Sequence, residues 1–153
     1  MGERNDMAQT GIERNNERVK VYIIVTGSRK EFNITRIEKG LRNIWHMLHN
    51  SSLGYPEATL IHGDAQGVDK MAGVVAYSWG WNVICMPANW NEYGKGAGPV
   101  RNQEMIDKAL SLGFNETNRI VCAAFPLLGS IGTWDCIKRA AAAKIKCVIF
   151  PHD

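Results

Sequence analysis

The feature that most constrains the fold is the run VKVYIIVTG at residues 19–27, which is rich in β-branched side chains and ends in glycine. A strand with one face in water alternates apolar and polar residues, whereas a near-continuous apolar run is typical of a strand buried on both faces. Such a strand needs a covering layer on each side. We therefore expect a sheet with helices on both of its faces.

Strand-like and helical patterns then alternate along the chain. The expected strands lie within residues 19–27, 58–67, 81–88, 119–125 and 146–150, and the expected helices within residues 34–50, 68–80, 99–113 and 133–144. This alternation predicts a three-layer, Rossmann-like α/β domain with a five-stranded, mainly parallel sheet. We expect a single domain over residues 19–153. Residues 1–18 have almost no large apolar side chains, which predicts a disordered N-terminal arm.

Composition narrows the class of protein. The chain has 153 residues, and no apolar run approaches the roughly 20 residues that cross a bilayer. No apolar signal-peptide core is present, so we expect a cytoplasmic protein without membrane contact. The net charge of +3 is small for a nucleic-acid surface but suits a small anionic ligand.

The four cysteines predict no metal site. None is paired as C-x-x-C, and no nearby histidines complete a zinc-binding spacing. A free cysteine behaves as a small buried side chain, so all four are expected to pack in the core. We expect neither a metal nor a cofactor.

The loops that follow the expected strands predict a ligand site, because parallel strands present their carboxyl ends, where ligands bind, at one edge of the sheet. All four loops carry glycine. In the first, Gly27 would let the backbone approach a ligand, Ser28 would donate to a phosphate and Arg29 would supply charge. The alternative is a plain strand-ending turn with a solvated arginine.

The second loop, HGDAQGVD, does not have the spacing of a dinucleotide-binding G-x-G-x-x-G motif. Its candidate ligand-binding residues are Gly63, Ala65, Gly67 and Asp69. Asp69 either caps or stabilises the first turn of the following helix, or it accepts hydrogen bonds from a ribose, and both hypotheses stay open. His62 is expected to be a packed or capping residue rather than a catalyst.

The third loop leads into YGKGAGPVRNQEM at residues 93–105. Gly98 would be the N-cap of a helix, Pro99 its first residue, and Arg101 and Asn102 part of its first turn. A cation is unfavourable at the positive end of a helix dipole unless an anion is bound there. The pattern therefore predicts an anion site. The alternative is a mobile loop with solvated cations.

Other side chains of the third loop complete this expected site. Lys95, Gly96 and Gly98 would lie beside the anion, and Trp90 and Tyr93 would either stack on a base or cover the core.

Five segments, VTGSR, HGDAQGVDKMA, PANWNEYGKGAGPVRNQEM, AAFPLLGSIGT and CIKRAAAAKIKCVIF, occur in the order and spacing of the YspA/YpsA-related branch of the SLOG superfamily. The resemblance extends over residues 21–150. It implies a Rossmann-like fold, a pocket for a nucleotide or nucleotide-derived molecule, and a homo-oligomer. The branch occurs in bacteria and phages. Relatives include the lonely-guy phosphoribohydrolases and the DprA/Smf DNA-processing proteins.

The fourth loop departs from the hydrolase relatives, which carry P-G-G-x-G-T and a glutamate three residues after the threonine. Here the loop is GSIGT, in which Ser130 replaces a glycine, and Cys136 stands at the glutamate position with Asp135 beside it. The phosphate-binding residues of this loop remain as Gly129, Ser130, Gly132 and Thr133.

The sequence therefore favours a protein that binds a nucleotide-derived, possibly signalling ligand without turnover, as a sensor or a sequestering protein. One alternative is a nucleotide N-glycosidase or phosphoribohydrolase that uses Asp69, Glu104 or Asp135 as its acid. A further alternative is a nucleic-acid binder, and the weak charge counts against it.

Overall fold

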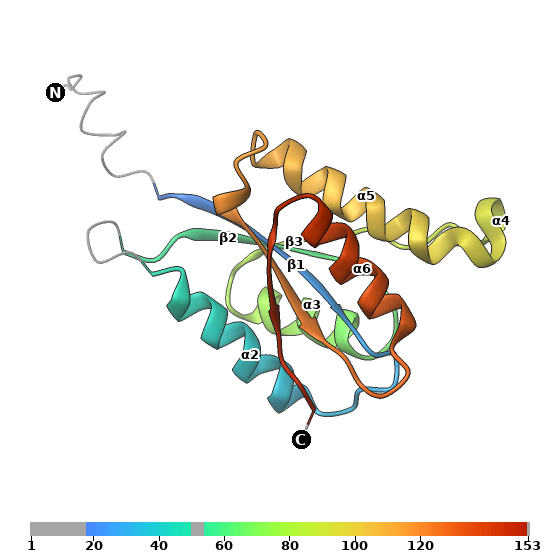
Figure 1. Cartoon of the computed structure of the whole chain (residues 1–153). Coiled ribbons are helices and arrows are strands. Elements are labelled where there is room, and N and C mark those ends of the chain that lie inside the picture. The colour runs from blue at the N-terminus through green and yellow to red at the C-terminus, as the bar shows by residue number, and fades with distance from the viewer. Residues whose placement is uncertain (1–17, 50–53, 153) are drawn as a thin grey trace, which may run out of the picture.

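The computed structural model describes residues 18–49 and 54–152, in which five strands form one parallel sheet between two layers of helices (Figure 1). The strands are β1 (Lys20–Gly27), β2 (Glu57–His62), β3 (Asn82–Cys85), β4 (Ile120–Phe125) and β5 (Lys146–Ile149). The helices are α2 (Ile34–Met47), α3 (Val68–Ser78), α4 (Trp90–Tyr93), α5 (Ala97–Leu112) and α6 (Ile131–Ala142), with 3-10 turns η1 (Gly94–Gly96) and η2 (Thr117–Arg119). The expected Rossmann-like fold is confirmed.

The side chains of β1 explain why both faces are covered. Val21, Ile23 and Val25 pack against α2 and α3, whereas Tyr22 and Ile24 pack against α5 and α6. Successive side chains of a strand point to opposite faces, so a continuous apolar run supplies two cores at once. The two apolar clusters lie between the sheet and the helices on its two faces, and Figure 1 shows these three layers.

The strand order is β3-β2-β1-β4-β5, and it determines where a ligand can bind. The chain builds outward from β1 to β3, and β4 then pairs with the other side of β1. The loops after β1 and β4 therefore lead to helices on opposite faces of the sheet, α2 and α6 (Figure 1). Such a switch point leaves a crevice at the carboxyl edge of the sheet.

The expected start of the third helix is wrong. The N-cap of α5 is Gly96 rather than Gly98, and the helix begins two residues before Pro99. The stretch from Trp90 to Gly96, expected as a loop, forms α4 and η1. The overlooked signal is Asn89, whose side chain accepts a hydrogen bond from the Glu92 N–H and caps α4.

The cysteines are less uniformly buried than expected. Cys122 and Cys136 are buried and Cys147 is half-buried, but Cys85 is exposed, so its assignment to the core is wrong. Cys85 is the last residue of β3, an edge strand that pairs with β2 on one side only.

The N-terminal arm predicted for residues 1–18 lies outside the described residues except for Arg18, whose guanidinium donates a hydrogen bond to the Pro56 carbonyl. In the part of the chain that the structure describes, no helix combines the length and apolarity needed to cross a bilayer.

A buried ion pair joins the loop after β1 to the ends of β4 and β5. The Arg36 guanidinium pairs with the Glu31 carboxylate and also donates to the backbone carbonyls of Pro126 and Phe150. Burial raises the pKa of Glu31, but hydrogen bonds from Asn33, Arg36 and Phe32 and the charge of Arg36 outweigh it and hold that pKa below its ordinary value. The pair fixes the direction in which the chain leaves β1.

We expect Arg36→Met to destabilise the fold by about 3 kcal/mol, the lower end of the range for removing one partner of a buried ion pair. The lower end applies because the Arg36 side chain is 14% exposed, so water can still reach part of its charge. The measurement is urea unfolding, with Lys39→Met on the exposed side of the same helix as the control. Equal stability of the two variants would contradict a structural role for the pair.

Candidate functional site

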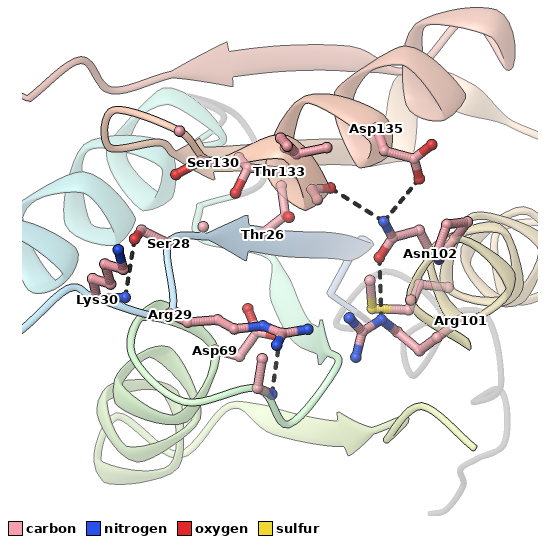
Figure 2. Close-up of a pocket in the computed structure, with 18 of the residues that line it drawn as sticks. Thr26, Ser28, Arg29, Lys30, Asp69, Arg101, Asn102, Ser130, Thr133 and Asp135 are labelled. Carbon is pink, nitrogen blue, oxygen red and sulfur yellow. Dashed lines mark hydrogen bonds between the residues drawn. The ribbon is translucent and has the colours of Figure 1, made fainter. Parts of the chain in front are cut away.

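A pocket of about 520 Å³ lies in the crevice at the carboxyl ends of β1 and β4 (Figure 2). Its walls come from the segment after β1, the start of α3, the first turns of α5 and the loop that leads into α6. The lining residues are Thr26, Gly27, Ser28, Arg29, Lys30, Ala65, Asp69, Trp90, Lys95, Gly98, Pro99, Arg101, Asn102, Met105, Leu128, Gly129, Ser130, Ile131, Gly132, Thr133 and Asp135. Segments far apart in the sequence thus share one cavity.

The structure brings most of the sequence-predicted residues to this pocket. Among the expected ligand-binding residues, Gly63, Gly67 and Gly96 do not line it. Among the candidate acids, Asp69 and Asp135 do, whereas Glu104 is exposed on α5 away from the lining.

Two glycines outside the pocket serve the packing of its walls. A side chain at Gly67 would collide with the Ser28 carbonyl at 2.3 Å, and its φ of 82° lies in the left-handed region. A side chain at Gly63 would overlap the Arg101 guanidinium at 2.2 Å. These glycines allow the second loop to pack closely against the first loop and against α5.

The first loop contributes a cation and a hydroxyl. The Ser28 Oγ accepts a hydrogen bond from the Lys30 N–H at 3.0 Å, which leaves its own proton free to be donated. The Arg29 guanidinium lies 5.5 Å from the centre of the Trp90 ring. The Trp90 indole, expected either to stack on a base or to cover the core, therefore lies beside an arginine, and both residues line the pocket. A Cβ at Gly27 would meet the Val68 side chain, so this glycine also serves close packing.

Asp69 organises the second loop. Its Oδ2 accepts hydrogen bonds from the backbone N–H groups of Gly63 at 3.0 Å and Ala65 at 3.4 Å. The α3 N-cap is Gly67, which caps without a side chain, so the capping role considered for Asp69 is wrong. Within residues 18–49 and 54–152, no hydrogen-bond donor contacts Oδ1 of this buried carboxylate.

The surroundings of Asp69 bring its titration close to neutrality. Burial raises its pKa to about 6, against the opposing effects of the Arg101 charge and of the Ala65 and Gly63 N–H groups. A carboxyl group with such a pKa can exchange a proton at physiological pH. Asp69 is thus the candidate acid in the pocket with the chemistry of a proton donor.

Arg101 and Asn102 form a buried network in the first turns of α5. The Arg101 guanidinium donates to the Gly63 carbonyl and to the Asn102 Oδ1. The Asn102 Nδ2 donates to the Gly132 carbonyl at 3.2 Å and to Asp135 at 2.9 Å, which links α5 to α6 (Figure 2). Both side chains already form hydrogen bonds within the protein. Arg101 therefore has fewer donors left for a ligand than the sequence indicated.

Asp135 completes this network and stays ionised. Burial raises its pKa, but hydrogen bonds from Arg139 and Asn102, together with the Arg139 charge, outweigh burial and hold the pKa below its ordinary value. Its Oδ2 lies 2.9 Å from the Arg139 Nε. A carboxylate held in this way is a poor proton donor.

The remaining charge in the pocket is positive. Arg29, Lys30 and Lys95 are exposed at its rim, and none of them forms an ion pair with another residue of the described segments. Arg101 adds a buried cation, while the charge of Asp135 is matched by Arg139. Three unpaired rim cations favour an anionic group in the cavity.

Sequence reasoning missed Thr26, Lys30, Pro99, Met105, Leu128 and Ile131 in the lining. Thr26 and Lys30 adjoin predicted residues of the first loop, and Met105 lies one turn after Arg101, so helical spacing could have found it. Leu128 and Ile131 are large exposed apolar side chains beside the glycines of the fourth loop. They give the pocket an apolar wall.

A second pocket, of about 380 Å³, adjoins the first. Arg29, Ala65, Trp90 and Arg101 line both cavities. The second cavity is completed by Gly63, Asp64, Gln66, Pro87 and Ala88. The Arg29–Trp90 pair therefore stands between two hollows of the same edge.

The fold and the pocket define an α/β protein of Rossmann-like type with a cavity at the switch point of its sheet. No model of a known protein family matches the chain. The chain is 33% identical over 137 residues to the Gene 61 protein of Mycobacterium phage D29, and the match covers 84% of this chain and 94% of that protein. The chain belongs to the family of this phage protein.

Two solved structures show weaker similarity. The DNA processing protein A (DprA) of Streptococcus pneumoniae has a TM-score of 0.42 and 17% identity, over 84% of this chain and 58% of that chain. The ferredoxin-NADP+ reductase of Plasmodium falciparum has a TM-score of 0.42 and 13% identity, over 93% of this chain and 56% of that chain. The chain thus spans just over half of either structure, and neither similarity identifies a ligand.

The raised pKa of Asp69 predicts a pH-dependent stability. Between the unfolded pKa of about 3.9 and the folded value of about 6, the folded state binds more protons, so stability falls as pH rises through this interval. We expect a loss of about 3 kcal/mol between about pH 4 and about pH 7 from this group. Asp69→Asn should remove this loss, because an amide does not titrate in this pH range. The fold should persist, because the amide oxygen can still accept hydrogen bonds from both N–H groups.

Urea unfolding at several pH values measures this dependence, and Asp107→Asn, at an exposed position on α5, is the control. A wild-type profile that is parallel to the Asp69→Asn profile from about pH 4 to about pH 7 would show that Asp69 is not perturbed by burial.

Proposed function

We propose that this protein binds a nucleotide or nucleotide-derived molecule in the switch-point pocket, as a sensor or sequestering protein that leaves its ligand intact. The observation that carries the proposal is the distribution of charge in the pocket. Cations that form no ion pair within residues 18–49 and 54–152 stand at the rim, and inside lies a buried carboxylate whose Oδ1 accepts no hydrogen bond from these residues. Such a site is complementary to a ligand with an anionic group at one end and hydroxyl donors at the other.

The phosphate would lie among Arg29, Lys95 and the loop into α6. The Ser28 hydroxyl retains a free proton, and the first N–H groups of the twelve-residue α6 follow Ser130, its N-cap. Anions are stabilised by such N–H groups and by the helix dipole. The charged rim, the hydroxyl and the helix end support a phosphate in the same part of the cavity.

The sugar would lie toward Asp69. A buried acceptor without a donor is costly, and a ligand hydroxyl would remove that cost. The ribose interpretation of Asp69 thus gains support from the free Oδ1, whereas the capping interpretation does not. A base would then lie toward the apolar wall of Leu128 and Ile131 or toward the exposed part of Trp90.

The first test is retention followed by mass spectrometry. The protein is incubated with a panel of nucleoside phosphates, NAD, ADP-ribose and cyclic nucleotides, filtered, and denatured to release what it held. We expect an intact panel member in the protein fraction at stoichiometric amount. The protein concentration is set above the dissociation constants that are usual for metabolites. If no panel member is then retained, the proposed function is wrong for this class of ligand.

For the retained ligand, Arg29→Met should weaken binding by about 1.5–3 kcal/mol, or roughly 10- to 150-fold in Kd, as expected for a hydrogen bond to a charged group. Arg29 suits this test because it is exposed, lies over the Trp90 ring and forms no ion pair with another residue of the described segments. Calorimetry measures the change, and Lys108→Met, at an exposed position of α5 outside the pocket, is the control. An equal Kd for both variants would place the anionic group elsewhere.

One observation favours an enzymatic alternative, a nucleotide N-glycosidase. A carboxyl group with a pKa of about 6 in a pocket is suited to protonate a leaving base. In this case free base would appear in the filtrate of the same experiment, and Asp69→Asn would abolish its release while retaining the ligand. Intact ligand with no free base after long incubation would exclude the alternative.

A further inference from the structure

Three potential metal ligands converge beside the second pocket. His62, Asp64 and Cys85 each offer one ligand atom, and these atoms lie within 4.8 Å of one another. His62 and Cys85 end the neighbouring strands β2 and β3 and are paired in register. Paired residues of adjacent strands point to the same face, so the imidazole and the thiol are brought together by the sheet itself.

Asp64 reaches the same place through an unusual backbone conformation. Its φ of 58° lies in the left-handed region, which few residues other than glycine adopt. The turn brings the Asp64 N–H to within 2.9 Å of the His62 Nδ1, to which it donates. Because Nδ1 accepts this hydrogen bond, it is unprotonated and its lone pair already points toward the Asp64 segment.

The other ring nitrogen is not available. Gly73 belongs to α3, and a Cβ atom added to this glycine would lie only 3.0 Å from the His62 Nε2. The Nε2 atom therefore faces α3. A metal ion would therefore bind Nδ1 and take the place of the Asp64 N–H.

We propose that His62, Asp64 and Cys85 form a binding site for Zn²⁺. An imidazole nitrogen, a thiolate and a carboxylate are a mixed ligand set that suits zinc, whereas Mg²⁺ and Ca²⁺ require oxygen ligands throughout. Three protein ligands leave the fourth position of a tetrahedral ion open to water or to another donor. The sequence pattern did not indicate this site, because Asp64 and Cys85 are 21 positions apart and Cys85 is brought beside the His62–Asp64 segment only by the pairing of β3 with β2.

A lysine now holds the position of the cation. The Lys70 Nζ lies 2.9 Å from Asp64 Oδ1, and both side chains are substantially exposed. Exposed ion pairs of this kind are weak, so a divalent ion with two further ligands would displace the ammonium group. Lys70 is therefore a competitor whose removal should strengthen metal binding.

The location gives the ion a neighbour. Asp64 also lines the second pocket, where it is the one acidic residue among the lining that the structure describes. Zinc bound by the Asp64 carboxylate and the Cys85 thiolate would cancel both negative charges, so this acidic corner of the pocket would become neutral while Arg29 and Arg101 remain charged.

Cobalt spectroscopy tests the site with the full chain. After removal of metals with a chelator, titration with Co²⁺ should give a thiolate-to-cobalt charge-transfer band that saturates at one equivalent and disappears when Zn²⁺ is added. Cys85→Ser should abolish the band, because the thiolate is the group that produces it. Cys147→Ser, which alters another incompletely buried free cysteine on the opposite edge strand, should retain it.

Two further variants measure the ligand set without disturbing the core. Asp64→Asn should weaken Co²⁺ binding by at least about tenfold, since even indirect partners of a metal site contribute that much. Lys70→Met should strengthen binding severalfold. Both positions are at least partly exposed, so the folded chain is expected to persist.

The proposal is overturned if Co²⁺ at saturation gives no charge-transfer band. It is also overturned if the band persists in Cys85→Ser or disappears in Cys147→Ser. Calorimetry with Zn²⁺ alone provides an independent readout, and equal Zn²⁺ affinity of wild type and Cys85→Ser would reject the site as well.

Discussion

Burial of β1 on both faces is the constraint on which the rest of the structure depends. A strand with apolar side chains on alternate faces is stable only if each face is covered, and the chain meets this requirement with α2 and α3 on one side and α5 and α6 on the other. To cover the second face the chain must return past β1, and β4 then pairs on its free side. The crevice that holds the pocket is a geometric consequence of this reversal.

A crevice at strand ends leaves polar groups that the fold must satisfy. Asp69 accepts two N–H groups of the second loop, and Asn102 donates to both Gly132 and Asp135 across the gap between α5 and α6. These bonds fix the walls before any ligand arrives. Binding at such a site requires little further ordering of the protein, and this lowers the entropic cost of association.

The fold was predictable because its signals are local. Each strand and helix carries its own pattern of apolar residues, and the glycine-bearing loops follow the strands directly in the sequence. The position of the pocket between β1 and β4 was not predictable in the same way, because strand order depends on packing between distant segments. The helical structure before Pro99 was missed for a related reason. Asn89 caps the short helix α4, which is too short to show an apolar pattern of its own.

The roles of individual site residues were harder to predict than their location. Arg101 stood out as a cation in the first turn of a helix, and a bound anion was one explanation of its position. In the structure its guanidinium is bound by the Gly63 carbonyl and by Asn102, so the cation is stabilised by the protein itself. Evidence for an anion therefore rests on Arg29, Lys30 and Lys95, which form no ion pair within the described segments. No sequence pattern shows whether a surface cation has an acidic partner.

The position of Asp69 decides how a ligand would be oriented. A carboxylate in an anion-binding pocket is unfavourable unless it lies away from the anion, and Asp69 is buried at the base of the cavity while the free cations stand at its rim. A bound phosphate beside Asp69 would raise its pKa further, whereas a hydroxyl donor on Oδ1 would stabilise the ionised form. The lower-energy arrangement has the phosphate outward and the hydroxyls inward.

This orientation also separates binding from catalysis. Oδ2 of Asp69 is held by two backbone N–H groups, so the carboxyl group has one free oxygen for either task. If Oδ1 accepts a sugar hydroxyl, it cannot at the same time protonate a leaving base. The second acid of the pocket, Asp135, is held ionised by Arg139 and Asn102 and is a poor proton donor, so this geometry is better suited to retaining the proposed ligand than to cleaving it.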